Sequence, residues 1–306
     1  MSLPNGIIFA YGNNLIVKLS FIDGEVGHSG WSPKFIALRS LEEKDVLSRK
    51  KMDVESVMVT GANRGIGLEF VRQLVKLNKP PKFVFATYRS ETAVQALKKI
   101  KDESEQTEVV LIKMDVRSLN DIENAQKIIE EKVGDKGLNL LINNAGVMKF
   151  EGFPEITEED FLFHFTTNTI APVIVLKKML PLLQRAAAHK TTGMSVSRAA
   201  VLNLSSELAA ISTAMNEFFR EFPPVMGYSV SKIAMNMAMR KAAFTVQEQG
   251  ILVVNMCPGW VKTDMGTEHA LLEVSESVSD MMKTLPELNE SHHGSHLDRN
   301  GKVVPF

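Results

Sequence analysis

The chain has 306 residues, 44% of them hydrophobic and 23% charged, with a formal net charge of −1 and an isoelectric point near 6.7. This composition is ordinary for a globular protein and excludes the basic character that draws a protein to nucleic acid or to an anionic membrane. The single cysteine, Cys257, excludes an intramolecular disulfide and favours a reducing, cytoplasmic setting. We expect neither a membrane span nor a secretory signal, because no apolar run approaches ~20 residues and the first residues lack a basic and then apolar pattern.

Residues 1–51 differ from the rest of the chain, because their short apolar patches follow no sustained period. We expect this extension to lie outside the main domain, either without fixed structure or as a mispredicted start. The alternative is an extra strand or arm packed on the domain. Residues 52–306 are expected to form one domain.

From Met52 onward, strand patterns and helix patterns alternate. The strand candidates are short, continuous apolar runs, at 56–60, 82–87, 108–115, 138–146, 200–206 and 251–259. Helix candidates lie between them, at 65–77, 93–100, 121–133, 158–183 with Pro172 as a possible kink, and 225–249. Continuous apolar strands are typical of a sheet that is covered on both faces, and strand–helix alternation predicts parallel strands. The predicted fold class is therefore α/β, a single doubly wound Rossmann-type domain.

Three glycines follow the first of these strands and open a helix: Gly61, Gly65 and Gly67. A glycine permits the tight turn and the close approach of a phosphate, and the helix start offers free N–H groups to it. The spacing G-x-x-x-G-x-G departs from the usual dinucleotide fingerprint, so a glycine-rich turn without a ligand is the alternative.

Two arginines bear on the choice of nucleotide. In sites that bind NAD, an acidic residue after the second strand holds the ribose 2′-hydroxyl. Here that strand ends in Arg89, the first acid is Glu91, and Arg64 lies between the glycines. Because guanidinium groups bind phosphate in a bidentate way, we expect NADP(H). The alternative is that both arginines belong to a solvated rim.

A possible acid–base pair begins the long helix at 225–249. Tyr228 and Lys232 are four residues apart and share a helix face. An ammonium beside a phenol is expected to lower the phenol pKa from its ordinary value near ~10. The spacing alone also occurs on ordinary solvated helix faces.

The motifs together resemble the short-chain dehydrogenase/reductase family, with a narrower similarity to its sniffer-type NADPH-dependent carbonyl reductases. They occur in the order typical of the family, as "TGANRGIG", "NNAG", "TTNTIAP", "NLSS", "YSVSK", "PGWVKT" and the closing "NGKVVPF". The resemblance spans most of residues 52–306 and implies a mostly parallel, seven-stranded sheet flanked by helices.

The resemblance also implies a role for each matching residue. Tyr228 would be the general acid, Lys232 would lower its pKa and hold the nicotinamide ribose, Ser206 would donate to the substrate oxygen, and Asn168 would order a water for proton resupply. The residues implied to bind the cofactor are Gly61, Arg64, Gly65, Ile66, Gly67, Arg89, Asp115, Val116, Asn144, Ala145, Gly146, Tyr228, Lys232, Pro258, Val261 and Thr263.

Two features leave questions open. Ser205 and Ser206 are adjacent and should point to opposite sides, and the motif alignment selects Ser206. Ser206 and Tyr228 are farther apart than is usual in the family, so 207–226 is expected to hold an insertion that shapes substrate choice or blocks a subunit contact. Residues 264–290 suggest a mobile helical lid.

Three histidines near the end of the chain, His292, His293 and His296, raise the possibility of a metal site. The segment coincides with the last strand and turn of the family, and we expect no metal. Cys257 is expected to be a reduced core thiol.

The expected function is NADPH-dependent reduction of a small aldehyde, ketone or quinone. The alternatives are an NAD-dependent alcohol or sterol dehydrogenase and a nucleotide-binding regulator without turnover. The expected partners are a small carbonyl substrate and a second copy of the chain, with a monomer possible.

Overall fold

The computed structural model describes residues 8–12, 15–19, 52–190, 193–215 and 224–306. The chain divides into two units, Met1–Ser48 and Arg49–Phe306. In the first unit, β1 (Ile8–Gly12) and β2 (Leu15–Leu19) form an antiparallel pair. The rest of the predicted extension, apart from this pair, lies outside the described residues.

A seven-stranded parallel sheet forms the centre of the second unit, in the order β5-β4-β3-β6-β7-β8-β9. The strands are β3 (Ser56–Val59), β4 (Phe83–Tyr88), β5 (Glu108–Lys113), β6 (Leu140–Asn143), β7 (Ala200–Leu204), β8 (Leu252–Cys257) and β9 (His296–Asp298). The order reverses between β3 and β6, which is the switch point where doubly wound sheets bind nucleotides. The predicted doubly wound α/β fold with a seven-stranded sheet is confirmed.

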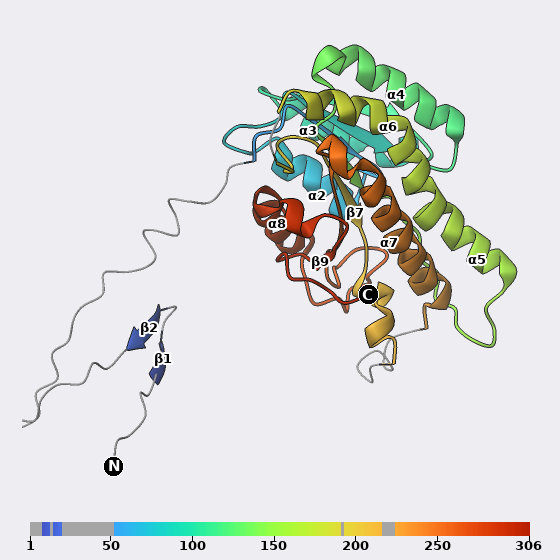
Figure 1. Cartoon of the computed structure of the whole chain (residues 1–306). Helices are drawn as coiled ribbons and strands as arrows, with labels where there is room; N and C mark the ends of the chain where they lie inside the picture. The colour runs from blue at the N-terminus through green and yellow to red at the C-terminus, as the bar shows by residue number, and fades with distance from the viewer. Residues whose placement is uncertain (1–7, 13–14, 20–51, 191–192, 216–223) are drawn as a thin grey trace, which may run out of the picture. The chain divides into compact units, whose positions relative to one another are not determined.

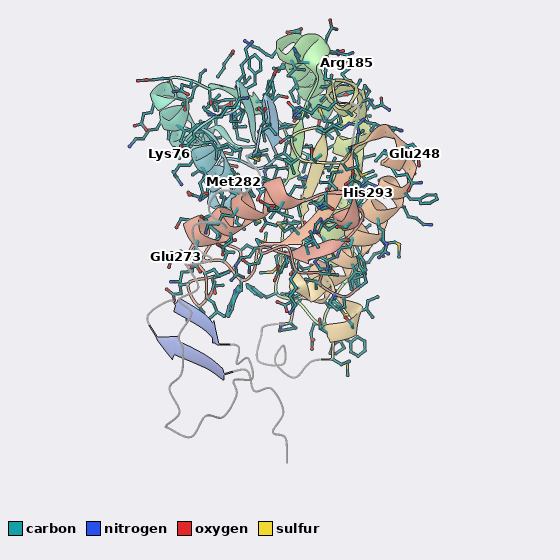
Figure 2. All side chains as sticks on the ribbon, turned by 60° about the vertical axis from the view of Figure 1, so that its left-hand side comes forward. Lys76, Arg185, Glu248, Glu273, Met282 and His293 are labelled. Carbon is teal, nitrogen blue, oxygen red and sulfur yellow. The ribbon has the colours of Figure 1, made fainter. Side chains whose placement is uncertain are left out.

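Helices cover both faces of the sheet (Figure 1). On one face lie α2 (Gly65–Leu74), α3 (Gln95–Glu103) and α8 (Val274–Thr284). On the other lie α4 (Leu119–Val133), α6 (Ala171–Ala188) and α7 (Met226–Val246). Figure 2 shows charged side chains on the outside of this unit, among them the exposed Lys76, Glu248 and Glu273.

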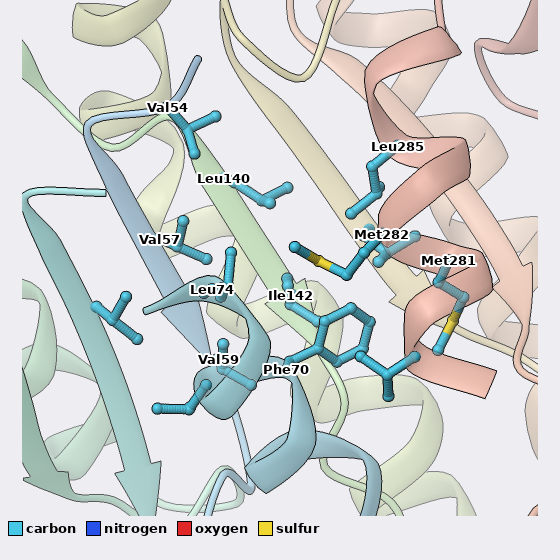
Figure 3. Packing of buried hydrophobic residues seen from close by; sticks show 14 of the residues in the cluster. Val54, Val57, Val59, Phe70, Leu74, Leu140, Ile142, Met281, Met282 and Leu285 are labelled. Atoms are coloured by element: carbon cyan, nitrogen blue, oxygen red, sulfur yellow. The ribbon is translucent and has the colours of Figure 1, made fainter. Parts of the chain in front are cut away.

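Apolar side chains from both sides of each central strand fill two separate cores. Val57 and Val59 of β3 face α2 and α8, whereas Met58 between them faces the other helical layer. Figure 3 shows Phe70 and Met282 closing the first core over the sheet. Burial on both faces explains why the strands are apolar without alternation.

The predicted helix at 158–183 is a helical region without a gap that extends to residue 188, but its hydrogen-bonding pattern changes within it. The structure has α5 (Glu158–His164), a π-helical segment η3 (Phe165–Ile170), and then α6. Pro172 is the second residue of α6 and directly follows the π-helical segment, so the change of hydrogen-bonding pattern lies next to this proline. The helices predicted at 65–77 and 225–249 correspond to α2 and α7, which are shorter.

The segment 264–290, predicted to be a mobile helical lid, contains helix α8. Helix α8 buries Val278 and Met281 completely, in the same core as α2. A helix anchored in this way belongs to the body of the domain. Short 3-10 helices follow it, at Leu285–Glu287 and Glu290–His292. Other 3-10 helices of the described residues are at Glu91–Ala93, Gly134–Lys136, Glu207–Ala209, Ile211–Thr213 and Gln247–Gln249.

None of the helices in the described part of the chain combines the length and the apolar character that a membrane crossing needs.

Candidate active site

The glycine turn after β3 lies against the turn after β6. Gly61 has a φ of +63°, and a Cβ there would lie 3.1 Å from the Cα of Ala145. A Cβ on Gly67 would lie 2.4 Å from the carbonyl oxygen of Gly61 and 2.5 Å from Nδ2 of Asn144. Asn144 in turn donates from Nδ2 to the carbonyl oxygens of Thr60 and Gly61, at 2.8 and 3.1 Å. The glycines are therefore required by backbone contact.

Helix α2 begins with its backbone donors open. Arg64, its N-cap residue, is extended, and no side chain of the described residues caps the first turn. Gly65 follows with a φ of +52°, and a Cβ there would lie 3.3 Å from Cγ2 of Thr263. The guanidinium of Arg64 pairs with the carboxylate of Asp264. The loops after β3 and β8 thus meet at a helix start that is able to bind an anion.

Arg89 and Asp115 follow β4 and β5, whose last residues, Tyr88 and Lys113, are in register. Arg89 is exposed. Asp115 accepts from Nη2 of Arg117 at 2.6 Å, and this bond is the main reason why its pKa is lowered, with Arg89 adding a smaller effect. Arg117 was not predicted from the sequence, and it adds a cation at this edge.

Tyr228 and Ser206 are brought together by α7 and the end of β7. Tyr228 is buried in the first turn of α7, and the Ser206 side chain lies close enough to its phenol to lower the phenol pKa in part. Ser206 also accepts from the backbone N of Leu208 at 3.2 Å. Of the two adjacent serines, Ser206 is therefore the one beside the phenol.

Lys232 lies one turn further along α7 and is also buried. Its Nζ donates to the carbonyl oxygen of Leu204 at 2.7 Å and lies 5.8 Å from the centre of the Tyr228 ring. Burial lowers the pKa of Lys232 to about 8, because a low-dielectric surrounding disfavours the ammonium.

The expected lowering of the Tyr228 pKa does not occur. Burial raises the pKa of Tyr228 to about 12, the hydrogen bond from Ser206 lowers it in part, and Cys257 raises it slightly. Desolvation disfavours the charged phenolate, and Nζ of Lys232 is directed to the carbonyl oxygen of Leu204. The phenol is therefore neutral at pH 7, which is the form that can donate a proton.

Asn168 lies within the π-helical segment η3. Its Nδ2 donates to the carbonyl oxygen of Val147 at 2.9 Å and to Oγ of Ser231 at 3.0 Å, and its Oδ1 accepts from the backbone N of Val147 at 2.9 Å. A Cβ on Gly146 would lie 3.3 Å from this Oδ1 and 3.7 Å from Nζ of Lys232. The π-helical segment thus brings Asn168 to the same small space as the lysine.

The remaining predicted residues lie around these turns. Val261 is buried and accepts at its backbone oxygen from Oγ1 of Thr263, at 3.3 Å. The backbone oxygen of Pro258 accepts from Oγ of Ser277 of α8, at 2.7 Å. Ile66 packs on the core, and Val116 and Ala145 line a cavity of about 10 Å³. The predicted insertion at 207–226 is described only at 207–215 and 224–226, so its middle lies outside the described residues.

The sequence analysis also missed a buried acid–imidazole pair at the start of α7. Oε1 of Glu151 lies 3.4 Å from Nδ1 of the fully buried His164. Gly227, which precedes Tyr228, faces both, because a Cβ there would lie 2.8 Å from each of these atoms. Nε2 of His164 accepts from the backbone N of Lys149 at 3.1 Å, so Nδ1 carries the proton. No motif could have indicated this pair.

The three histidines near the end of the chain have separate environments. His292 accepts from the backbone N of Asn289 at 3.2 Å, and His293 accepts from that of Val253 at 3.2 Å. His296 is fully buried, and burial lowers its pKa to about 4. Among the described residues, no three metal-ligating side chains gather at one point.

A larger cavity, of about 110 Å³, lies at the amino-terminal edge of the sheet, far from these residues in the fold. Residues that precede β3, β6 and β7 line it, among them Asp53, Asn139 and Ser197. Ligands of doubly wound sheets bind at the carboxyl edge, so we assign no role to this cavity in the chemistry.

Comparison with known proteins agrees with this geometry. Residues 55–271 match the family model of the short chain dehydrogenases. An NADPH-bound carbonyl reductase from chicken fatty liver is 38% identical, with a TM-score of 0.79 over 84% of this chain and 96% of that one. The carbonyl reductase Sniffer of Drosophila melanogaster is 32% identical, with a TM-score of 0.77 over 83% of this chain and 100% of that one. An uncharacterised oxidoreductase of Schizosaccharomyces pombe is 28% identical over 81% of this chain and 96% of its own length.

The chain belongs to the short-chain dehydrogenase family and is an oxidoreductase of that family. Within the family it is similar to the sniffer-type carbonyl reductases.

Proposed function

We propose that the chain reduces a small aldehyde, ketone or quinone with NADPH, in the cytoplasm. The observation that carries the proposal is the cluster of buried Tyr228, Lys232 and Asn168 with half-buried Ser206, beside the turn after β6 at Gly146. The identity to an NADPH-bound carbonyl reductase supports it.

The residues at the carboxyl edge of the sheet fit NADP(H). The open N–H groups at the start of α2 suit the pyrophosphate, and the exposed Arg89 suits a 2′-phosphate. Glu91, the first acid after β4, is bonded at 3.0 Å to the hydroxyl of Tyr88. One of its two carboxylate oxygens is thereby engaged with the end of β4.

In this proposal the bound nucleotide supplies a hydride to the carbonyl carbon. Ser206 donates a hydrogen bond to the carbonyl oxygen, where negative charge develops. Tyr228 gives its phenolic proton to that oxygen, so the C=O bond becomes CH–OH. Lys232 stabilises the phenolate that remains. Asn168 orders the water through which the phenol regains its proton.

The test is a panel of carbonyl compounds with NADPH and three proteins. Tyr228→Phe should lower kcat by about 10³-fold or more, because the phenolic proton is lost. Tyr88→Phe is the matched control and should keep the wild-type rate, since Tyr88 bonds only to Glu91 in the described structure. Equal rates for wild type and Tyr228→Phe would reject the mechanism.

Arg89→Asp tests the choice of nucleotide. We expect it to raise KM for NADPH at least tenfold and to favour NADH, because a carboxylate repels a 2′-phosphate. Lys98→Asp makes the same change of charge at an exposed position on α3. It should leave KM for NADPH and KM for NADH unchanged. Tighter binding of NAD than NADP by wild type, with no effect of Arg89→Asp, would instead support the alcohol or sterol dehydrogenase.

We further propose a homodimer that pairs through α7. Val230, Met237 and Phe244 recur every seventh residue and are 36%, 59% and 73% exposed. Side chains at this spacing form one stripe on a helix, and an apolar stripe favours a partner surface. Light scattering should give a dimer for wild type and a monomer for the double variant Met237→Glu, Phe244→Glu. A monomeric wild type would reject the dimer.

A further inference from the structure

One face of α7 carries three side chains that bind the carboxyl end of β7. Tyr228, Lys232 and Asn236 are spaced four residues apart, so they lie in a row along that face. The first two belong to the proposed catalytic cluster. Asn236 has no role in the chemistry proposed above. It is only 1% exposed, and a polar side chain buried to this degree needs a hydrogen-bond partner.

Asn236 is fixed by Ser205, the neighbour of Ser206. Oγ of Ser205 donates to Oδ1 of Asn236 at 2.7 Å, and Ser205 is itself 3% exposed. Nδ2 of Asn236 has no partner in the described part of the structure. The Ser205 hydroxyl therefore makes the one hydrogen bond found for this amide group among the described residues.

A row of amides continues from Asn236 across the sheet. The backbone oxygen of Asn236 lies 3.5 Å from Nδ2 of Asn255 in β8. Oδ1 of Asn255 accepts from Asn203 in β7 at 3.1 Å, and Asn203 accepts from Asn143 in β6 at 2.9 Å. These three asparagines are direct register partners on adjacent strands. The row thus ties α7 to the strands that end at the proposed active site.

We propose that Ser205 and Asn236 are positioning residues that set the rotation and axial height of α7, and thereby aim Tyr228 and Lys232. The inference rests on the proposed function. Apolar contacts elsewhere on α7, such as those of Met235 and Met239, are non-directional and tolerate small slips of a helix. A buried hydrogen bond is directional, and its loss leaves a desolvated amide without a partner. A displacement of about 1 Å at reacting atoms can cost ~10²-fold in rate.

The test measures kcat, KM and hydrogen–deuterium exchange for Ser205→Ala, Asn236→Ala and the double variant. Each single change should lower kcat about tenfold, leave KM for NADPH within about twofold, and speed exchange along 226–240. The double variant should be no worse than either single one, because both changes remove the same bond. Ser205→Thr, which retains the hydroxyl, should restore most of kcat.

Thr107→Val is the matched control. Thr107 also buries a hydroxyl, bonded at 2.7 Å to the backbone oxygen of Pro81, but it lies beside β5. The Thr107→Val variant should keep the wild-type kcat and the wild-type rate of hydrogen–deuterium exchange along α7. The proposal is overturned if Ser205→Ala and Asn236→Ala keep wild-type kcat, if their effects multiply in the double variant, or if Thr107→Val has the same effect. Unchanged exchange along α7 would also overturn it, whether or not carbonyl compounds are turned over. Equal rates for wild type and Tyr228→Phe would instead reject the proposed function.

Discussion

At the scale of single residues, burial governs the ionisation of the proposed catalytic pair. The same desolvation raises the pKa of Tyr228 to about 12 and lowers that of Lys232 to about 8. The phenol is thereby kept as a proton donor, and the ammonium is kept near the point of losing its charge. A sequence can place a lysine one turn from a tyrosine, but it does not reveal that Leu204 accepts from that lysine.

These pKa values predict how the reaction depends on pH. We expect kcat for carbonyl reduction to be constant below about pH 7 and to fall above about pH 8, as Lys232 loses its proton and no longer stabilises the phenolate. The measurement is kcat at saturating NADPH and substrate between pH 6 and 10. A rate that stays constant up to pH 10 would contradict the assignment of Lys232.

At the scale of elements, the glycine turn is fixed by backbone contact. Gly67→Ala would place a methyl 2.4 Å from the carbonyl oxygen of Gly61, which cannot move without opening the turn. We expect a loss of several kcal/mol of unfolding free energy and of NADPH binding. Gly134→Ala, at the end of α4, meets no atom within 4 Å and should cost about 1–3 kcal/mol for its backbone conformation alone, with φ +52° and ψ −133°. Denaturant unfolding measures the stability of the two variants, and NADPH fluorescence measures their cofactor binding. Equal losses of both in Gly67→Ala and Gly134→Ala would contradict the role of backbone contact at Gly67.

The side chain of Glu151 lies at the start of α7, and its burial disfavours the ionised carboxylate. Burial raises the pKa of Glu151, while His164 and Lys149 oppose the rise and Asp160 adds to it. A carboxyl whose pKa is higher in the folded than in the unfolded state lowers stability as pH rises through its ordinary value of 4.5. Glu151→Gln should therefore be more stable than wild type at pH 7.

Thermal unfolding at several pH values measures this effect. The advantage of Glu151→Gln should vanish below about pH 4, where the carboxyl is protonated in both states. Glu155→Gln, an exposed change in the same loop, should match wild type throughout. An advantage that persists at pH 3 would mean that the effect comes from packing and not from ionisation.

The pattern of elements was largely predictable, and the contacts between side chains were not. Continuous apolar strands and their alternation with helices predicted the doubly wound sheet, since both depend on local spacing alone. The π-helical turn at Asn168 was not predicted, because a segment of six residues, Phe165–Ile170, is too short for its spacing to be distinguished from that of an α-helix. The pairing of Ser205 with Asn236, and of Glu151 with His164, joins residues far apart in sequence, and no motif encodes it.

At the scale of the whole molecule, the seven-stranded sheet and both of its cores lie within Arg49–Phe306. A variant that starts at Arg49 should therefore fold with the Tm of the full chain and keep its NADPH binding. A second variant that starts at Val57 loses Met52 and Val54, which are 9% and 4% exposed in the first core, and it should unfold several degrees lower. Differential scanning calorimetry would compare the three. If the variant from Arg49 unfolds as low as the one from Val57, residues 1–48 contribute to the stability of the domain, and the extension is part of the native fold.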